Sequence, residues 1–300
     1  MFKKIISAAL LAAMLQSTAL ASDALASGEP EIQNKLDSVY ASLDSSRNRF
    51  DYESDEIFAN FREITTTGIR PKTVYRSSNP VDINSNKVRH SFADKLARKV
   101  GIKAEIDLSD DDSDLQDYFK SKAARKKYCY GLYRQGKLFN RHLTGNGLES
   151  RDWPLIAEVF RFMLQNDGPY LVHCRLGRDR AGFISMLCSA LAGATVEDLR
   201  SDYMQTYCNY YHIKPHSYEY EMIRMFQADR IIYYIAHPEY ASDRKPMPKK
   251  ISVRNIIPEE AAVNFFKTAL QFSEEEIAAL QARLKDPDKT NSNDEVFFGL

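Results

Sequence analysis

The residues best placed to do chemistry lie in one short segment, residues 170–182. An apolar run leads to His173 and Cys174. Five residues separate Cys174 from Arg180, and an apolar stretch over residues 183–191 follows Arg180. This order predicts a strand, a tight loop and a buried helix. The backbone N–H groups of such a loop, together with the positive end of the helix dipole, attract anions. The spacing His-Cys-x₂-Gly-x₂-Arg therefore predicts a phosphate-binding loop that carries a cysteine.

Each residue type in this loop has an expected role. Cys174 is the expected nucleophile, because the loop's positive field favours its thiolate form. Arg180 can hold two phosphate oxygens with its planar guanidinium, and Gly177 lets the main chain approach the ligand. His173 is expected to orient the loop. The predicted reaction is hydrolysis of phosphate esters through a phosphocysteine intermediate. The other residues expected at the substrate are Arg175, Leu176, Arg178, Ala181 and Gly182.

Strands and helices are predicted to alternate around this loop. Residues 73–77 and 102–108 have the patterns of strands, the second with charged residues at every other position. Helices are predicted over residues 91–100, ending at Gly101, and over 151–166, with Pro154 in the first turn. Thr195 with Asp198, and Ser273 with Glu276, form capping boxes that start two more helices. The predicted class is α/β, with a mostly parallel central sheet flanked by helices.

The chain divides into five expected parts. Residues 1–21 have the basic start, apolar run and small-residue cleavage site of a signal peptide, with an alternative cleavage after residue 26. The protein is therefore expected to be exported, to a periplasm or beyond, with no transmembrane segment in the mature chain. A polar leader (22–50) and a catalytic domain (51–240) follow. A linker with C-terminal helices packing on that domain (241–285) and a tail (286–300) complete the chain.

Composition limits the partners. The chain has 41 basic and 41 acidic residues, so no bulk electrostatic partner is implied. Residues 121–148 hold a basic run with tyrosines among its members, but without a recognised nucleic-acid-binding fold we expect no nucleic acid. No metal-ligand spacing is visible, and no cofactor is expected. Beyond Cys174 an odd number of cysteines remains (Cys129, Cys188 and Cys208), which argues against a disulfide framework. Composition does not indicate an oligomeric state.

The loop resembles the active-site loop of protein tyrosine and dual-specificity phosphatases, the Cys-x₅-Arg superfamily. More narrowly, it resembles a bacterial branch written H-C-x-x-G-K-D-R-[TA]-G. The resemblance extends over residues 55–285. Phe61-Arg62 and residues 74–80 are similar to that branch's "FR … YRSS-P" signature. Residues 101–108 are similar to its "GIKTVIDL" strand, and residues 202–211 to its "DYM-TY-NYY" helix. The resemblance implies a tyrosine-phosphatase-like fold and activity.

The resemblance also implies a general acid that protonates the leaving oxygen. Asp179 is the first candidate for this acid, as in superfamily members that have an aspartate at the same position. In the alternative, Asp179 only orients Arg180. Asp152, Glu149 and Asp107 follow as candidates, in that order. Two loop residues depart from the pattern. Ala181 stands where most of the superfamily has a hydroxyl that assists phosphoenzyme breakdown, and Arg178 replaces a lysine.

The sequence leaves the substrate class open. A phosphorylated protein is the first expectation, for a tyrosine or dual-specificity phosphatase. The alternative is a phosphorylated inositol or lipid, because Arg175 and Arg178 occupy positions where phosphoinositide 3-phosphatases of the superfamily carry lysines. A third hypothesis, from another class, is a pseudophosphatase that binds phosphorylated ligands without turnover.

Overall fold

A single sheet lies at the centre of the protein, whose computed structural model describes residues 29–81, 88–144 and 148–290. Within these residues, the strand order is β1-β2-β5-β3-β4. β1 is antiparallel to β2, and the other neighbouring pairs are parallel. The predicted class, α/β with a mostly parallel sheet, is confirmed. The strands are β1 (Arg62–Glu63), β2 (Val74–Ser78), β3 (Ala104–Asp107), β4 (Leu138–Asn140) and β5 (Tyr170–Cys174).

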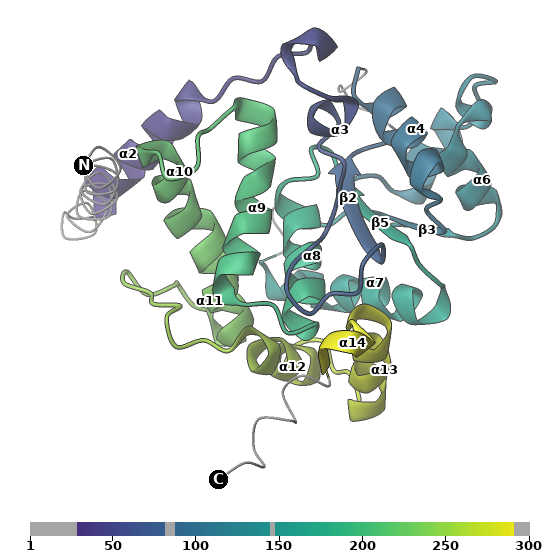
Figure 1. Ribbon diagram of the computed structural model, residues 1–300. Helices are drawn as coiled ribbons and strands as arrows, with labels where there is room; N and C mark the ends of the chain where they lie inside the picture. The colour runs from purple at the N-terminus through teal and green to yellow at the C-terminus, as the bar shows by residue number, and fades with distance from the viewer. Residues whose placement is uncertain (1–28, 82–87, 145–147, 291–300) are drawn as a thin grey trace, which may run out of the picture.

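Helices cover both faces of the sheet, and each face has its own apolar core (Figure 1). One face packs on α4 (His90–Val100), α5 (Asp112–Tyr118) and α6 (Tyr128–Arg134). The core on the other face is formed by α7 (Trp153–Gln165) and α8 (Asp179–Leu191), with α9 (Val196–Tyr211), α12 (Pro258–Thr268) and α13 (Glu274–Leu284) packed against these helices. The remaining helices are α2 (Glu29–Ser42), α3 (Asp55–Phe58), α10 (Tyr218–Ile223), α11 (Asp229–Ala236) and α14 (Pro287–Thr290). Short 3₁₀ turns cover Arg49–Asp51, Ala124–Lys126, Ser150–Asp152 and Pro238–Tyr240, and a π-helical turn joins α10 to α11 at Arg224–Ala228.

Local signals set the helix ends as predicted. α4 ends at Gly101, whose φ of 73° lies in the left-handed region that glycine adopts readily. Both predicted capping boxes are present, at Thr195 before α9 and at Ser273 before α13. Pro154 lies in the first turn of α7. These signals act within a few residues, which is why the sequence pattern is sufficient to place them.

An acidic run such as residues 109–114 is expected from its sequence to be a solvated loop, but the structure shows otherwise. Asp110 is buried, and Asp111 caps α5 through a capping box with Asp114. The expectation was wrong for Asp110 because an acidic run does not show which of its members faces inward. The side chain of Asp110 turns toward the catalytic loop region and accepts a hydrogen bond of 2.6 Å from Asn79 Nδ2.

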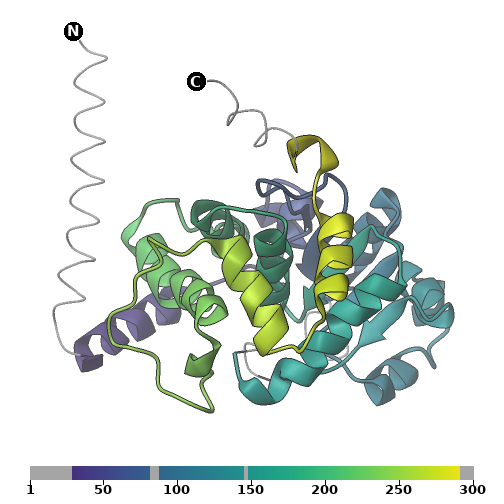
Figure 2. The same ribbon diagram turned by 90° about the horizontal axis from the view of Figure 1, so that it is seen from below.

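Both ends of the described chain pack on the domain. In the segment expected to be a polar leader, Leu36 and Val39 of α2 are buried, and α2 lies beside α10 (Figures 1 and 2). Phe265 and Phe266 of α12 are buried, and α12 packs along α8. The expected signal peptide lies outside the described residues. Within residues 29–81, 88–144 and 148–290, no helix combines the length and apolar character needed to cross a bilayer.

Candidate active site

The cysteine loop runs from the end of β5 to the first turn of α8 and packs against β2. Gly177 has a φ of 66°, and its N–H donates to the carbonyl of Cys174 at 3.2 Å. A Cβ at this position would lie 2.0 Å from the carbonyl oxygen of Ser77. The loop therefore needs glycine here for two reasons, its left-handed conformation and its contact with the neighbouring strand.

The carbonyl groups of the loop are bound from behind by a buried arginine. Arg76 on β2 is 0% exposed, and its Nη2 donates to the carbonyls of Gly177 (2.8 Å) and Arg178 (2.9 Å). Asn60 Nδ2 donates to the carbonyl of Leu176 at 3.3 Å. In a trans peptide the C=O and N–H groups point in opposite directions. Binding the carbonyls of Gly177 and Arg178 from outside therefore directs the N–H groups of the same peptides, those of Arg178 and Asp179, toward an anion inside the loop.

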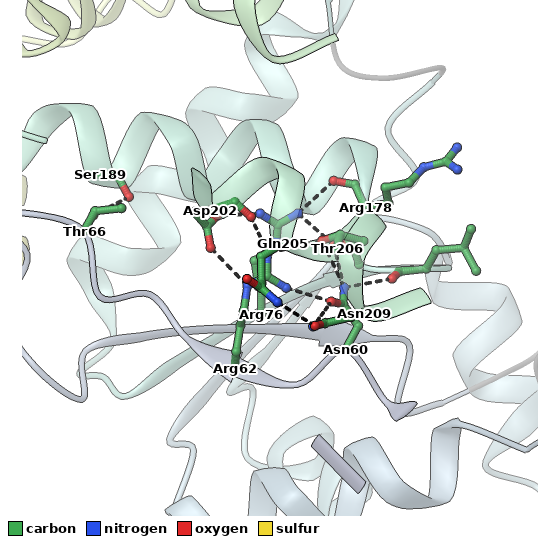
Figure 3. Close-up of polar contacts among 12 residues, drawn as sticks. Asn60, Arg62, Thr66, Arg76, Arg178, Ser189, Asp202, Gln205, Thr206 and Asn209 are labelled. Carbon is green, nitrogen blue, oxygen red and sulfur yellow. Dashed lines mark hydrogen bonds and ion pairs between the residues drawn. The ribbon is translucent and has the colours of Figure 1, made fainter. Parts of the chain in front are cut away.

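A second layer of polar residues holds this arginine in place (Figure 3). Asp202 on α9 forms ion pairs with Arg76 (2.7 Å) and Arg62 (3.0 Å). Arg62 also donates to Asn60 Oδ1 at 2.7 Å. Burial alone would raise the pKa of Asp202, but Arg62 and Arg76 outweigh burial and lower it. Thr206 and Asn209 complete this group, which we call the loop brace: Asn60, Arg62, Arg76, Asp202, Thr206 and Asn209.

The sequence predictions gave these six residues no role in the site. Most of them lie in the motifs "FR", "YRSS" and "DYM-TY-NYY", which carried only the family resemblance. Those motifs were the available signal for a role in the site, because they place charged residues in otherwise apolar segments. Their common function is to shape the cysteine loop.

Arg180 points one edge of its guanidinium at the protein and keeps the other edge available. Its Nη1 donates to the carbonyls of Leu108 (2.7 Å) and Leu143 (3.1 Å). Within the part of the chain that the structure describes, Nε and Nη2 have no partner. These two nitrogens form the edge that binds two oxygens of a phosphate group.

The family model described as "Tyrosine phosphatase family" matches residues 56–286. The chain belongs to the tyrosine phosphatase family. It is therefore a cysteine-based phosphatase. No curated protein sequence matches it. Among solved structures, it is similar to the core catalytic domain of the PP-IP phosphatase SIW14 from S. cerevisiae, in complex with citrate. That match has 18% identity and a TM-score of 0.33, and covers 60% of this chain and 93% of the other.

In this member of the tyrosine phosphatase family, Arg178 and Asp179 bind each other. Arg178 Nε and Nη2 lie 2.9 and 3.0 Å from the carboxylate oxygens of Asp179. Arg178 Nη1 donates to the hydroxyl of Tyr211 at 2.9 Å, and the guanidinium lies over the ring of Tyr207. Asp179 accepts a further bond from Tyr203. The alternative in which Asp179 only orients Arg180 is wrong, because its partners are Arg178 and Tyr203.

The other predicted acids have different positions. Asp107 is 0% exposed and accepts hydrogen bonds from the backbone and side chain of Ser109, so a general-acid role for it is wrong. Asp152 is buried and accepts both its bonds from Thr144, at 3.0 Å. Glu149 pairs with Arg151. Asp179, with a side chain 32% exposed, is the predicted acid that lies in the loop itself and reaches solvent.

The remaining loop predictions divide between surface and core. Arg175 is exposed and Leu176 is partly exposed. Ala181 and Gly182 are buried in the first turn of α8. Gly182 was predicted to bind substrate, but its N–H donates to the carbonyl of Arg178 at 2.9 Å. A Cβ there would meet Tyr203 and Arg76 at 2.8 and 2.9 Å, so its small size serves packing against the brace.

The described residues also bear on metal binding and on the state of the cysteines. Among the residues described, no group of three or more His, Cys, Asp or Glu side chains is arranged to hold a metal ion. Cys129, Cys174, Cys188 and Cys208 are free thiols. Burial raises the pKa of Cys188 to about 12, which keeps that thiol protonated and unreactive.

Proposed function

We propose that this protein is a protein tyrosine or dual-specificity phosphatase. One observation supports this function over that of an inositide phosphatase. That observation is the engagement of Arg178, whose three guanidinium nitrogens are all bound by Asp179 and Tyr211. An arginine paired in this way has no edge on which both nitrogens are unbound, which is the edge that a second phosphate would need for a two-point contact. A single phosphate group, held by the loop and Arg180, matches the charge that the site offers.

In the proposed mechanism, Cys174 attacks the phosphorus in line with the ester oxygen. The Sγ–P bond forms as the P–O bond breaks, and the leaving oxygen takes a proton from Asp179 Oδ1. Asp179 Oδ2 accepts from both Nε (3.1 Å) and Nη2 (3.0 Å) of Arg178, so the arginine stays bound when Oδ1 is protonated. The free edge of Arg180 and the loop N–H groups stabilise the charge on the equatorial oxygens. Water then attacks the phosphorus of the phosphocysteine and passes a proton to Asp179 as the S–P bond breaks, which releases phosphate and restores both the thiolate and the acid. The loop brace contributes by holding the N–H groups in place before the substrate arrives.

The test is phosphate release from a matched panel, with Cys174→Ser as control. The panel contains phosphotyrosine and phosphoserine peptides, phosphoinositide micelles and soluble inositol polyphosphates. We expect the highest kcat/KM on phosphotyrosine and no release by the control. Preference for an inositide would refute the proposal and assign a substrate contact to the exposed Arg175. Binding without release from any substrate would instead support a pseudophosphatase.

We also propose that the protein is exported. Lys3 and Lys4, the apolar run after them and the Ala19-Leu20-Ala21 site support this proposal. Expression of the full chain in a bacterium, followed by fractionation and N-terminal mass analysis, tests it. A product in the periplasm or medium that begins near residue 22 or 27 is expected. An uncleaved product in the cytoplasm would contradict export.

A further inference from the structure

We propose that Glu105 is a positioning residue for the Cys174 nucleophile: from the far face of the sheet it holds the neighbouring His173 in one orientation, as an imidazolium. The inference rests on the proposed function in taking Cys174 as the nucleophile. Glu105 has no counterpart in the "GIKTVIDL" strand that residues 101–108 resemble, where this position is a valine. Its role is therefore a property of this chain.

Strand geometry places this pair directly behind the nucleophile. Successive residues of a strand point to opposite faces, so Cys174 faces the α8 side and His173 faces the α4 and α6 side. β3 is the parallel neighbour of β5, with Asp107 opposite His173 in the register. Glu105 and Asp107 point to the same face as His173, because they are two residues apart on β3.

Glu105 and His173 are bonded in a fully buried environment. His173 Nε2 lies 2.9 Å from Glu105 Oε1, and both side chains are 0% exposed. His173 Nδ1 lies 3.7 Å from Asp107 Oδ1, which is beyond hydrogen-bonding distance but close for opposite charges. Glu105 Oε2, Asp107 Oδ2 and His173 Nδ1 have no hydrogen-bond partner among the described residues. A buried carboxylate with so few partners needs a nearby positive charge.

His173 is the group that supplies this charge. Burial alone would lower its pKa, but the carboxylates of Asp107 and Glu105 outweigh burial and raise it. Burial raises the pKa of Glu105, and the hydrogen bond from His173 opposes that rise. Among the described residues, the other titratable groups that interact with this cluster include Asp94 on α4, Tyr128 and Cys129 on α6, and Asp110 after β3; Arg98 and Lys127 lie next to Tyr128 and Cys129.

The orientation of His173 reaches the catalytic groups through the main chain. The carbonyl of His173 accepts a hydrogen bond from the N–H of Leu108 at 3.0 Å. The carbonyl of Leu108 accepts the 2.7 Å bond from Arg180 Nη1. One residue at the end of β3 therefore connects the residue before the nucleophile to the phosphate-binding arginine. An imidazolium at position 173 also places a positive charge on the residue next to the nucleophile.

The test is Glu105→Gln, which keeps an acceptor for His173 Nε2 and removes the carboxylate charge. Alkylation of Cys174 by iodoacetamide reports the thiolate fraction, and it requires no substrate. We expect the alkylation rate at pH 6 to fall on the order of tenfold, with recovery toward the wild-type rate at pH 8. kcat/KM should follow the same pH dependence. In a His173→Asn background, Glu105→Gln should have no further effect on the pH dependence.

Asp94→Asn is the matched control, because Asp94 is also buried on this face but binds the N–H groups of Tyr128 and Cys129. This variant should lose stability and should change the pH dependence of alkylation much less than Glu105→Gln does, because Asp94 is not bonded to His173. A wild-type-like profile for Glu105→Gln would overturn the proposal. If that variant does not fold, side-chain ¹⁵N shifts of His173 in the wild-type protein decide: an imidazolium at pH 7 supports the proposal, and a neutral ring refutes it. Neither readout depends on which phosphate ester is hydrolysed.

Discussion

A methyl group at position 177 tests directly whether the shape of the cysteine loop controls catalysis. In Gly177→Ala, the new Cβ would begin 2.0 Å from the carbonyl oxygen of Ser77, and real Cβ atoms do not approach closer than 3.0 Å. The loop must therefore move away from β2 by about 1 Å, and misplacement on this scale costs roughly 100-fold in rate. The left-handed φ of 66° adds backbone strain of about 1–2 kcal/mol. We expect kcat/KM to fall at least about 100-fold.

Gly101→Ala separates this steric effect from backbone strain. Gly101 has a similar φ of 73°, but nothing lies within 4 Å of a Cβ built on it. This variant should lose about 1 kcal/mol of unfolding free energy in urea and keep kcat/KM within about twofold. Both variants are assayed with an aryl phosphate and by urea unfolding. Near-wild-type kcat/KM in a folded Gly177→Ala protein would refute the reasoning, because the loop would then tolerate displacement.

Three further predictions concern carboxylates. Asp179→Asn should reduce kcat on an alkyl phosphate by about 10²–10⁴-fold and least affect an aryl phosphate with a good leaving group; equal losses on both would contradict its role as acid. Asp202→Asn leaves Arg62 and Arg76 without their carboxylate and should cost about 3 kcal/mol in urea unfolding. Because these arginines lower the pKa of Asp202, its carboxylate stabilises the folded protein at neutral pH, and this stabilisation is lost as the pH falls through the folded-state pKa. The unfolding free energy of Asp202→Asn should therefore decrease less in acid than that of the wild-type protein. Burial beside Asp107 raises the pKa of Asp110 from 3.8 to about 7, so the folded state binds this proton more tightly than the unfolded state. Unfolding free energy should therefore fall between about pH 4 and 7, and Asp110→Asn should flatten that fall in a urea series; an unchanged slope would contradict the assignment.

Much of the fold could be predicted because its signals are local. The caps of α9 and α13, the glycine end of α4 and the proline start of α7 all depend on residues within one helical turn. The cysteine loop belongs to the same class, since its strand, turn and helix are contiguous in the chain. The predicted strand around Glu105 was also found, but the alternation of charged and apolar residues did not reveal that its charged face is buried.

The loop brace could not be predicted because its contacts join distant segments. Arg76 binds the carbonyl of Gly177, 101 residues later, and Asp202, 126 residues later. A sequence pattern shows that Arg76 follows an apolar strand residue, but not which carbonyls lie beside it after folding. Correct prediction would have required the positions of β2, β5 and α9 relative to one another.

The sequence by itself determined the chemistry: a cysteine, a glycine and an arginine at the spacing of a strand–loop–helix anion site, with local caps that set the helix ends. Only the tertiary structure decided which charges are available to a substrate. Arg178 and Arg180 are two residues apart, yet one is bound on every nitrogen and the other keeps a free edge among the described residues. Asp179, the next residue in the chain, binds two nitrogens of Arg178, whereas Tyr211 binds the third, and Leu108 and Leu143 bind Nη1 of Arg180; these three come from distant parts of the chain. Spacing along the chain specifies which groups are present, whereas packing between distant segments specifies which of them are already satisfied.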